Sequence, residues 1–150
     1  MSVEQLGPTA RTYNPGRTAA WLAKQVELGL ATVDLSISQY RILSILAEGS
    51  AQSSALAERL AVRPPSVTAV IDGLVTRGLV ERTHREDDRR RVSLELTTEG
   101  LRVLASADDA VNGRLEQISS SLGAKGSARA LSCLSRWHEA MVLYRAARAK

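Results

Sequence analysis

The spacing of apolar residues predicts two helices near the start of the chain. In residues 17–33, apolar side chains recur every three or four positions without an intervening proline, the pattern of an amphipathic helix. Residues 1–16 contain several turn-forming residues instead and are expected to form a flexible tail. Ser36 followed by Gln39 is a capping-box pattern that predicts the start of a second helix, and Glu48-Gly49 is expected to end it.

Two short amphipathic segments follow, separated by a pair of prolines. Residues 53–61 place Leu56 and Leu60 on one helical face. Because a residue that precedes proline avoids the helical region, we expect Pro64 to lie outside the next helix and Pro65 to start it. Gly78 stands where a left-handed cap would end that helix. Two short helices joined by a tight turn form a helix-turn-helix pattern, although a chance pair of helices has a similar spacing.

The next segment has the two-residue alternation of a β-hairpin. Residues 79–83 have the composition of a strand, and residues 92–96 alternate apolar and polar side chains. The eight residues between them, 84–91, include seven that are formally charged. A loop this polar must project into solvent or onto an anionic partner. A helix-turn-helix followed directly by a hairpin is a winged helix.

Two longer helices are predicted after the hairpin. Thr97 and Thr98 both offer an N-cap, and Glu99 would lie in the first turn. Small residues at 119–126 break the pattern, so the last helix is expected over residues 127–147. Its apolar stripe, a core or an interface, consists of Leu131, Leu134, Trp137, Met141 and Tyr144. The pattern predicts a mainly α fold with a small β-hairpin wing.

Length and composition narrow the class of protein. A chain of 150 residues, 44% of them hydrophobic, is long enough for one domain with its own core. The single cysteine cannot form an internal disulfide, and no apolar run is long enough to span a membrane. The first residues lack the apolar stretch of a signal peptide. We therefore expect a reduced, cytoplasmic protein.

The charge distribution permits an anionic partner without establishing one. The net charge is +4, and 17 of the 20 basic residues are arginines, which form bidentate contacts with phosphates and guanine. Residues 53–98 carry a net charge of only +1, whereas residues 124–150 carry +5. A merely soluble surface accounts for the total equally well, so charge alone does not identify the partner.

The wing and the segment after it resemble the MarR family of transcriptional regulators. Asp88-Arg89-Arg90 stands eight residues before Leu96-Thr97, with Gly100 in place, as an acidic and arginine-rich wing tip precedes a helix start in that family. The match extends over about residues 17–147. Further segments that resemble the family are LSISQYRIL (35–43), LAERLAV (56–62) and GLVER (78–82).

The resemblance implies a homodimer that binds double-stranded DNA. Residues 17–35 and 99–150 would form a helical dimerisation region, and residues 36–98 a winged helix-turn-helix lobe. Each lobe would place its recognition helix in the major groove and its wing tip in the flanking minor groove. A two-fold dimer is expected to bind a pseudo-palindromic operator with half-sites about one DNA turn apart. Such proteins are mostly repressors, and many are released by a small phenolic or other aromatic effector.

Candidate DNA contacts begin at the start of the recognition helix. Ser66 and Thr68 lie in its first turns, where hydroxyls reach base edges or phosphates, although Ser66 could instead act as a cap. Arg63 cannot accept a capping bond but can bind a phosphate. Ala69 and Gly73 stand where the family often has Arg or Lys, which predicts fewer phosphate contacts and a shallower salt dependence.

The hairpin tip supplies the second set of candidate DNA contacts. Arg90 is the candidate for the minor groove, because narrow A·T-rich grooves have an enhanced negative potential. Asp88 would orient Arg90 through a charge-assisted bond. The candidate phosphate contacts are Arg85, Arg89 and Arg91. A solvated hairpin tip is the alternative for the whole run.

Aromatic, cysteine and histidine residues complete the candidate sites. Trp21 and Tyr40 are candidates for an effector pocket, although aromatics at helical spacing are more often core. Cys133 is expected to be structural and buried. His84 and His138 have no metal-ligand partners nearby and no catalytic motif is found, so we expect no metal, no cofactor and no enzyme activity. The alternative to a DNA-binding regulator is a winged-helix protein-interaction module without DNA binding.

Overall fold

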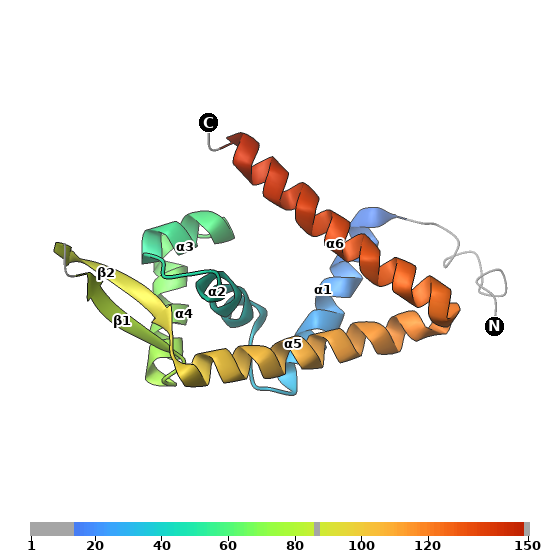
Figure 1. Cartoon of the computed structure of the whole chain (residues 1–150), viewed down its shortest axis with the longest axis horizontal. Coiled ribbons are helices and arrows are strands. Elements are labelled where there is room, and N and C mark those ends of the chain that lie inside the picture. Colours follow the sequence, from blue (N-terminus) through green and yellow to red (C-terminus); the bar gives the residue numbers. More distant parts are fainter. Residues whose placement is uncertain (1–13, 86–87, 149–150) are drawn as a thin grey trace.

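The fold is mainly helical, with a two-stranded antiparallel wing at one end (Figure 1). The structure, a computed structural model, describes residues 14–85 and 88–148, and the side chains of these residues except for 84–85 and 88–91. The described elements are α1 (Pro15–Ala31), α2 (Ile37–Ala47), α3 (Ser53–Leu60), α4 (Pro64–Thr76), β1 (Val80–Arg85), β2 (Asp88–Leu96), α5 (Thr98–Ser119), the 3₁₀ turn η3 (Ser120–Leu122) and α6 (Gly123–Arg148). The predicted fold class is confirmed.

One apolar core joins the winged lobe to the helices beside it. Leu43 of α2, Leu56 of α3 and Leu74 of α4 are completely buried. The same cluster continues into Leu30 of α1 and Leu104 of α5. Burial of each such leucine side chain contributes about 1.5–3 kcal/mol, so the lobe is held to α1 and α5 by its own core.

Local capping signals fix several helix ends as predicted. The Ser36 amide donates to Gln39 Oε1 at 2.8 Å, and the Gln39 amide donates to Ser36 Oγ at 3.2 Å, which forms the capping box at the start of α2. Gly78 has a φ of +69° directly after α4, as expected of a left-handed cap. Thr97 caps α5 by accepting from the Gly100 amide at 2.9 Å.

Three predicted boundaries are wrong. Helix α1 begins at Pro15 rather than residue 17, because Asn14 accepts from the Arg17 amide and proline suits the first helical position. Pro64 is the first residue of α4 rather than a residue outside it. Pro64 and Pro65 have no backbone N–H, but the first turn of a helix needs no intrahelical hydrogen bond from its N–H groups. Helix α6 begins at Gly123 instead of residue 127, because the break is confined to the short turn η3.

The hairpin extends further than the sequence predicts. Antiparallel pairing runs from Val80↔Leu96 to His84↔Val92, and a bulge then separates His84 from Arg85. The predicted loop of residues 84–91 is therefore wrong, since only residues 86–87 lie between the two strands. Ala51 exchanges two backbone hydrogen bonds with Leu94, at 3.2 and 2.9 Å, which fastens the sheet to the segment before α3.

Helix α5 runs from the base of the wing to the opposite side of the molecule (Figure 1), and α1 and α6 each pack against it. Helix α1 packs closely against α5, where a Cβ on Gly29 would lie 3.2 Å from the Ala110 carbonyl oxygen. Arg114 of α5 donates twice to Gln25 Oε1 of α1, at 3.0 and 2.7 Å. Helix α6 turns back after η3 and leaves α5, so that all of residues 132–148 are exposed. No helix of residues 14–85 and 88–148 is both long enough and apolar enough to cross a membrane.

Candidate nucleic-acid interface

Helix α4 divides into an apolar inner face and a polar outer face. Val67, Ile71 and Leu74 are buried in the lobe. Ser66 and Thr68 are both exposed in the first turns, as the candidate contacts must be. Thr68 donates its hydroxyl to the Pro64 carbonyl oxygen at 3.1 Å, which leaves its oxygen lone pairs to accept from a ligand.

The start of α4 has no free backbone amide to offer an anion. Pro64 and Pro65 have no N–H, and the amides of Ser66 and Val67 both donate to the Arg63 carbonyl oxygen, at 3.1 and 3.4 Å. A phosphate at this end would therefore meet side chains and the helix dipole only. Arg63 is the N-cap residue, and its exposed side chain makes no capping hydrogen bond. Ser66 is therefore not the cap of this helix.

The acidic residue on the outer face of α4, Asp72, forms an ion pair with Arg82 of β1. Asp72 accepts a hydrogen bond from the guanidinium of Arg82 on β1, in an ion pair between two partly exposed side chains. Arg82 also lines a groove between α4 and the sheet with Thr68 and Val92. Sequence reasoning missed this pairing, because no sequence spacing reports which strand residue faces a preceding helix.

A second arginine that sequence reasoning missed lies on the other flank of α4. Arg41 of α2 is exposed, and its Nη2 lies 3.5 Å from the Leu60 carbonyl oxygen. It lines a small hollow between α2, α3 and α4 together with Ser38 and Ser66. A lone arginine in a helix has no distinctive sequence pattern, so only the fold reveals that Arg41 borders the same surface as Ser66.

The candidates of the hairpin tip lie on strands at the end of the wing farthest from α5 (Figure 1). Arg85 pairs with Asp88 in the strand register. The side chains of the candidates lie outside the described residues, so the expected contact between Asp88 and Arg90 stays a prediction. The same holds for the candidates Arg89 and Arg91.

The two candidate pocket aromatics lie in different environments. Tyr40 of α2 donates its hydroxyl to Asp108 Oδ1 of α5 at 2.5 Å. Burial, followed by this bond to the carboxylate, holds the pKa of Tyr40 well above its usual value, so the phenol stays a neutral donor. Trp21 of α1 is 70% exposed. Their shared role in an effector pocket stays a prediction.

The expectation that Cys133 is buried is wrong for the single chain. Cys133 is exposed on α6, and a shallow hollow beside it is lined by Arg136 and Trp137. The cause is that α6 has no buried residue along its whole length. His138 is exposed on the same helix, and the side chain of His84 lies outside the described residues.

Comparisons with known proteins agree with this architecture. A family model described as MarR family matches residues 35–92. The HTH-type transcriptional regulator FarR of Neisseria gonorrhoeae is 34% identical over 95 residues, which cover 63% of this chain and 65% of FarR. The regulator YhbI of Bacillus subtilis is 34% identical over 108 residues, which cover 71% of this chain and 67% of YhbI.

Solved structures show the same arrangement of elements. The transcriptional repressor CouR bound to a 23-mer DNA duplex is 29% identical, with a TM-score of 0.67 over 82% of this chain and 88% of that chain. CouR from Rhodococcus jostii RHA1 bound to p-coumaroyl-CoA is 25% identical, with a TM-score of 0.63 over 68% and 73%. The chain covers less than two thirds of the length of the first curated relatives that it matches.

Proposed function

The chain belongs to the MarR family of HTH-type transcriptional regulators, and from this membership we propose that it is a homodimeric, sequence-specific DNA-binding repressor. In this proposal residues 36–98 bind DNA, residues 17–35 and 99–150 form the dimer, and a small effector releases the protein. Of the predicted tail, residues 1–16, Pro15 and Gly16 belong to α1 instead, and residues 1–13 lie outside the described residues. The family is one of transcriptional regulators and not of enzymes.

The observation that carries the proposal is the groove between α4 and the hairpin, which Thr68, Arg82 and Val92 line. The exposed hydroxyls of Ser66 and Thr68 lie on the outer face of α4, and the hairpin follows in the same lobe. A helix of this kind fits the major groove, where side-chain hydroxyls can reach base edges. The pairing of Asp72 with Arg82 removes the one acidic charge that would repel phosphates from α4.

We assign the remaining candidates by their charge and their place in the lobe. Arg90 enters the minor groove beside each half-site, with Asp88 orienting it. Arg63 lies just before α4, where a DNA backbone would pass. The phosphate contacts on the wing are Arg85, Arg89 and Arg91. The binding of CouR, a structural relative, to a DNA duplex supports this assignment.

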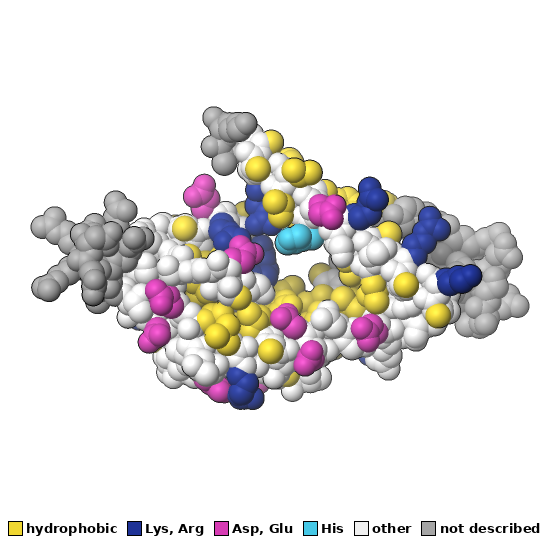
Figure 2. Space-filling model, viewed as in Figure 1, with side chains coloured by type: hydrophobic (Ala, Val, Ile, Leu, Met, Phe, Trp, Pro, Cys, Tyr) yellow, Lys and Arg dark blue, Asp and Glu magenta, His cyan; other side chains and the backbone are white. Residues whose placement is uncertain are grey.

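An uncovered apolar face on α6 supports the homodimer. Trp137 is 66% exposed and Tyr144 63% exposed. With Leu134 and Met141, which are also exposed, they form a stripe at helical spacing. Figure 2 shows hydrophobic side chains along α6 where it extends beyond α5. A two-fold dimer covers such a stripe with a second copy of itself.

The effector part of the proposal rests on a structural relative and on two aromatic residues. CouR is bound to p-coumaroyl-CoA in one of its structures, which supports an aromatic or phenolic acyl effector. Tyr40 of α2 donates a hydrogen bond to Asp108 of α5, and Trp21 lies exposed on α1. A ligand that displaces the Tyr40–Asp108 bond would act between the lobe and the dimerisation helices.

Salt-dependent binding to random duplex separates this proposal from a protein-interaction module. We expect a dissociation constant of about 10⁻⁴–10⁻⁶ M. It should rise as the salt concentration is raised, because phosphate contacts release counterions. The variant Arg90→Ala should bind more weakly, whereas the matched control Arg102→Ala should not, since Arg102 pairs with Glu99 on α5. A folded dimer that binds no duplex at low salt would refute the proposal and favour the interaction module.

A further inference from the structure

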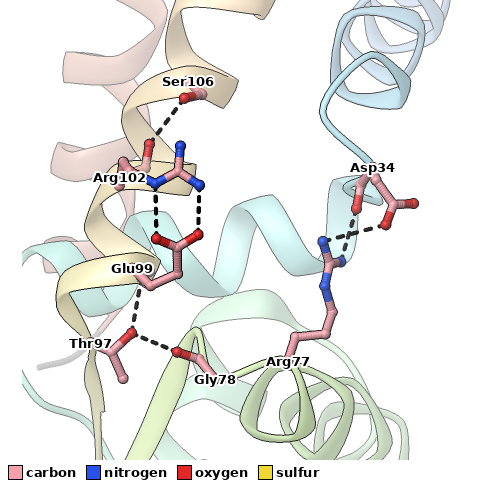
Figure 3. A network of polar contacts seen from close by, with 8 residues as sticks. Asp34, Arg77, Gly78, Thr97, Glu99, Arg102 and Ser106 are labelled. Carbon is pink, nitrogen blue, oxygen red and sulfur yellow. Dashed lines mark hydrogen bonds and ion pairs between the residues drawn. The ribbon is translucent and has the colours of Figure 1, made fainter.

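The residue that follows α4, Arg77, contacts the connection between α1 and α2. Arg77 caps α4, and its Nη1 donates to the Asp34 carbonyl oxygen at 2.8 Å. Its Nη2 lies 3.5 Å from Asp34 Oδ2. Figure 3 shows the guanidinium spanning the space between the two elements. The C-terminal end of α4 is therefore bonded to the segment that follows α1.

The same end of α4 is bonded to the start of α5. Thr97 donates its hydroxyl to the Gly78 carbonyl oxygen at 2.7 Å (Figure 3) and its amide to the Leu79 carbonyl oxygen at 3.2 Å. A Cβ on Gly100 would lie only 2.0 Å from that Leu79 oxygen. The first turn of α5 is thus fitted directly against the residues that leave α4.

Helices α1 and α5 are themselves held together, by the bonds from Arg114 to Gln25 and by close packing at Gly29. They belong to the proposed dimerisation region. Residues 77–79, at the far end of α4 from Ser66 and Thr68, are thus joined to both helices. A small change of angle at this junction would displace the polar end of α4.

We infer that Arg77 is a positioning residue for DNA reading: its clamp on the Asp34 backbone sets the angle of α4 relative to the dimerisation helices. In a two-fold dimer that angle fixes the separation of the two recognition helices, and with it the operator spacing that the protein accepts. The role in spacing rests on the proposed function, whereas the clamp itself does not.

The geometry says which of the two Arg77 contacts matters. The Asp34 side chain is 97% exposed and 3.5 Å away, and exposed ion pairs of this kind contribute little. The bond to the Asp34 carbonyl oxygen is short, and Asp34 holds an uncommon left-handed conformation with a φ of +53°. Asp34→Asn should therefore change little, whereas Arg77→Gln removes the clamp.

A direct phosphate contact is the competing role for an exposed arginine at this end of α4. Such a contact would make Arg77→Gln weaken binding to every DNA sequence and reduce the salt slope by about one. A positioning role leaves random-duplex binding and its salt slope unchanged. It instead alters the ratio between affinities for differently spaced operators.

The clamp can be tested without DNA by an intra-chain distance between spin labels on α1 and α4. Labels at Lys24→Cys and Ala69→Cys, in a Cys133→Ser chain diluted with unlabelled protein, report the angle of α4 in any oligomeric state. The matched control is Arg59→Gln, because Arg59 is similarly exposed and its ion pair with Glu48 lies within the lobe. We expect Arg77→Gln to broaden the distance distribution and Arg59→Gln to leave it unchanged.

The second measurement compares unlabelled proteins on selected operators whose spacers differ by one or two base pairs. We expect Arg77→Gln to reduce the preference for the best spacer by about threefold or more, Arg77→Lys to restore part of it, and Asp34→Asn to retain it. An unchanged label distribution in Arg77→Gln would overturn the inference, as would a uniform loss of affinity on all duplexes. If the wild type binds no DNA, the proposed function fails while the label distances still decide the clamp.

Discussion

A single methyl group at the start of α5 tests the junction where the lobe meets the long helices. In the variant Gly100→Ala the new Cβ would lie 2.0 Å from the Leu79 carbonyl oxygen. Real Cβ atoms essentially never come within 3.0 Å of a heavy atom outside their own residue and its two chain neighbours. The helix and the residues after α4 must therefore separate by about 1 Å, although Leu79 is buried and backbone on both sides resists the movement.

The expected cost follows from three contributions. Overpacking of a close contact typically costs about 1–3 kcal/mol. The separation also weakens the bond from the Thr97 amide to the Leu79 oxygen, which is worth about 1 kcal/mol. The better helix propensity of alanine returns at most about 1 kcal/mol. We expect Gly100→Ala to be less stable by about 2 kcal/mol, which lowers Tm by about 4–8 °C in a chain of this size.

Thermal or urea unfolding at one fixed chain concentration measures this change, because the stability of the proposed dimer would depend on concentration. The matched control is Gly113→Ala in the same helix, where an added Cβ meets nothing within 4 Å. That variant should gain about 0.5–1 kcal/mol, since glycine is costly inside a helix. Equal or greater stability of Gly100→Ala relative to the wild type would refute the reasoning.

Three further variants test other parts of the account. Trp137→Lys should weaken the dimer at least about 100-fold in sedimentation, because a large apolar side chain is replaced by a charge in both copies; an unchanged dimer would place the interface elsewhere. Arg90→Ala should weaken operator binding and its preference for A·T-rich flanks while leaving Tm unaltered, whereas an unfolded variant would reveal a structural residue. Tyr40→Phe should cost about 1–2 kcal/mol at neutral pH through the lost bond to Asp108. Because the pKa of Tyr40 is raised in the folded protein, the stabilisation by Tyr40 is complete below pH about 10 and is lost as the pH rises further. The difference in free energy of unfolding between wild type and Tyr40→Phe should therefore decrease above that pH. A difference that stays constant would contradict this.

The parts of the fold that the sequence predicts are those with a local physical cause. The Ser36–Gln39 capping box and the left-handed Gly78 depend on residues within a few positions of one another. The errors also have local causes. At the start of α1, Asn14-Pro15 has the composition of a turn but forms the helix cap. Before β2, a run of charges has the composition of a loop but continues the strands.

The contacts that the sequence does not predict are those made between distant elements. Arg82 pairs with Asp72, and Arg77 reaches Asp34, only because α4, β1 and the α1–α2 connection converge in space. The exposure of Cys133 has a similar origin, since the apolar pattern of α6 predicts burial without saying what covers it. Periodicity identifies a face, whereas the partner of that face is a property of the assembled molecule.

The most direct test of the central proposal is selection of bound sequences from a random duplex pool by the purified protein. A folded dimer with two recognition helices should recover a two-fold motif whose half-sites lie about one DNA turn apart, roughly 34–36 Å. Positions within each half-site should change in Ser66→Ala and Thr68→Ala, and the A·T preference of the flanks should decline in Arg90→Ala. Recovery of no motif by a folded, dimeric protein would contradict the account.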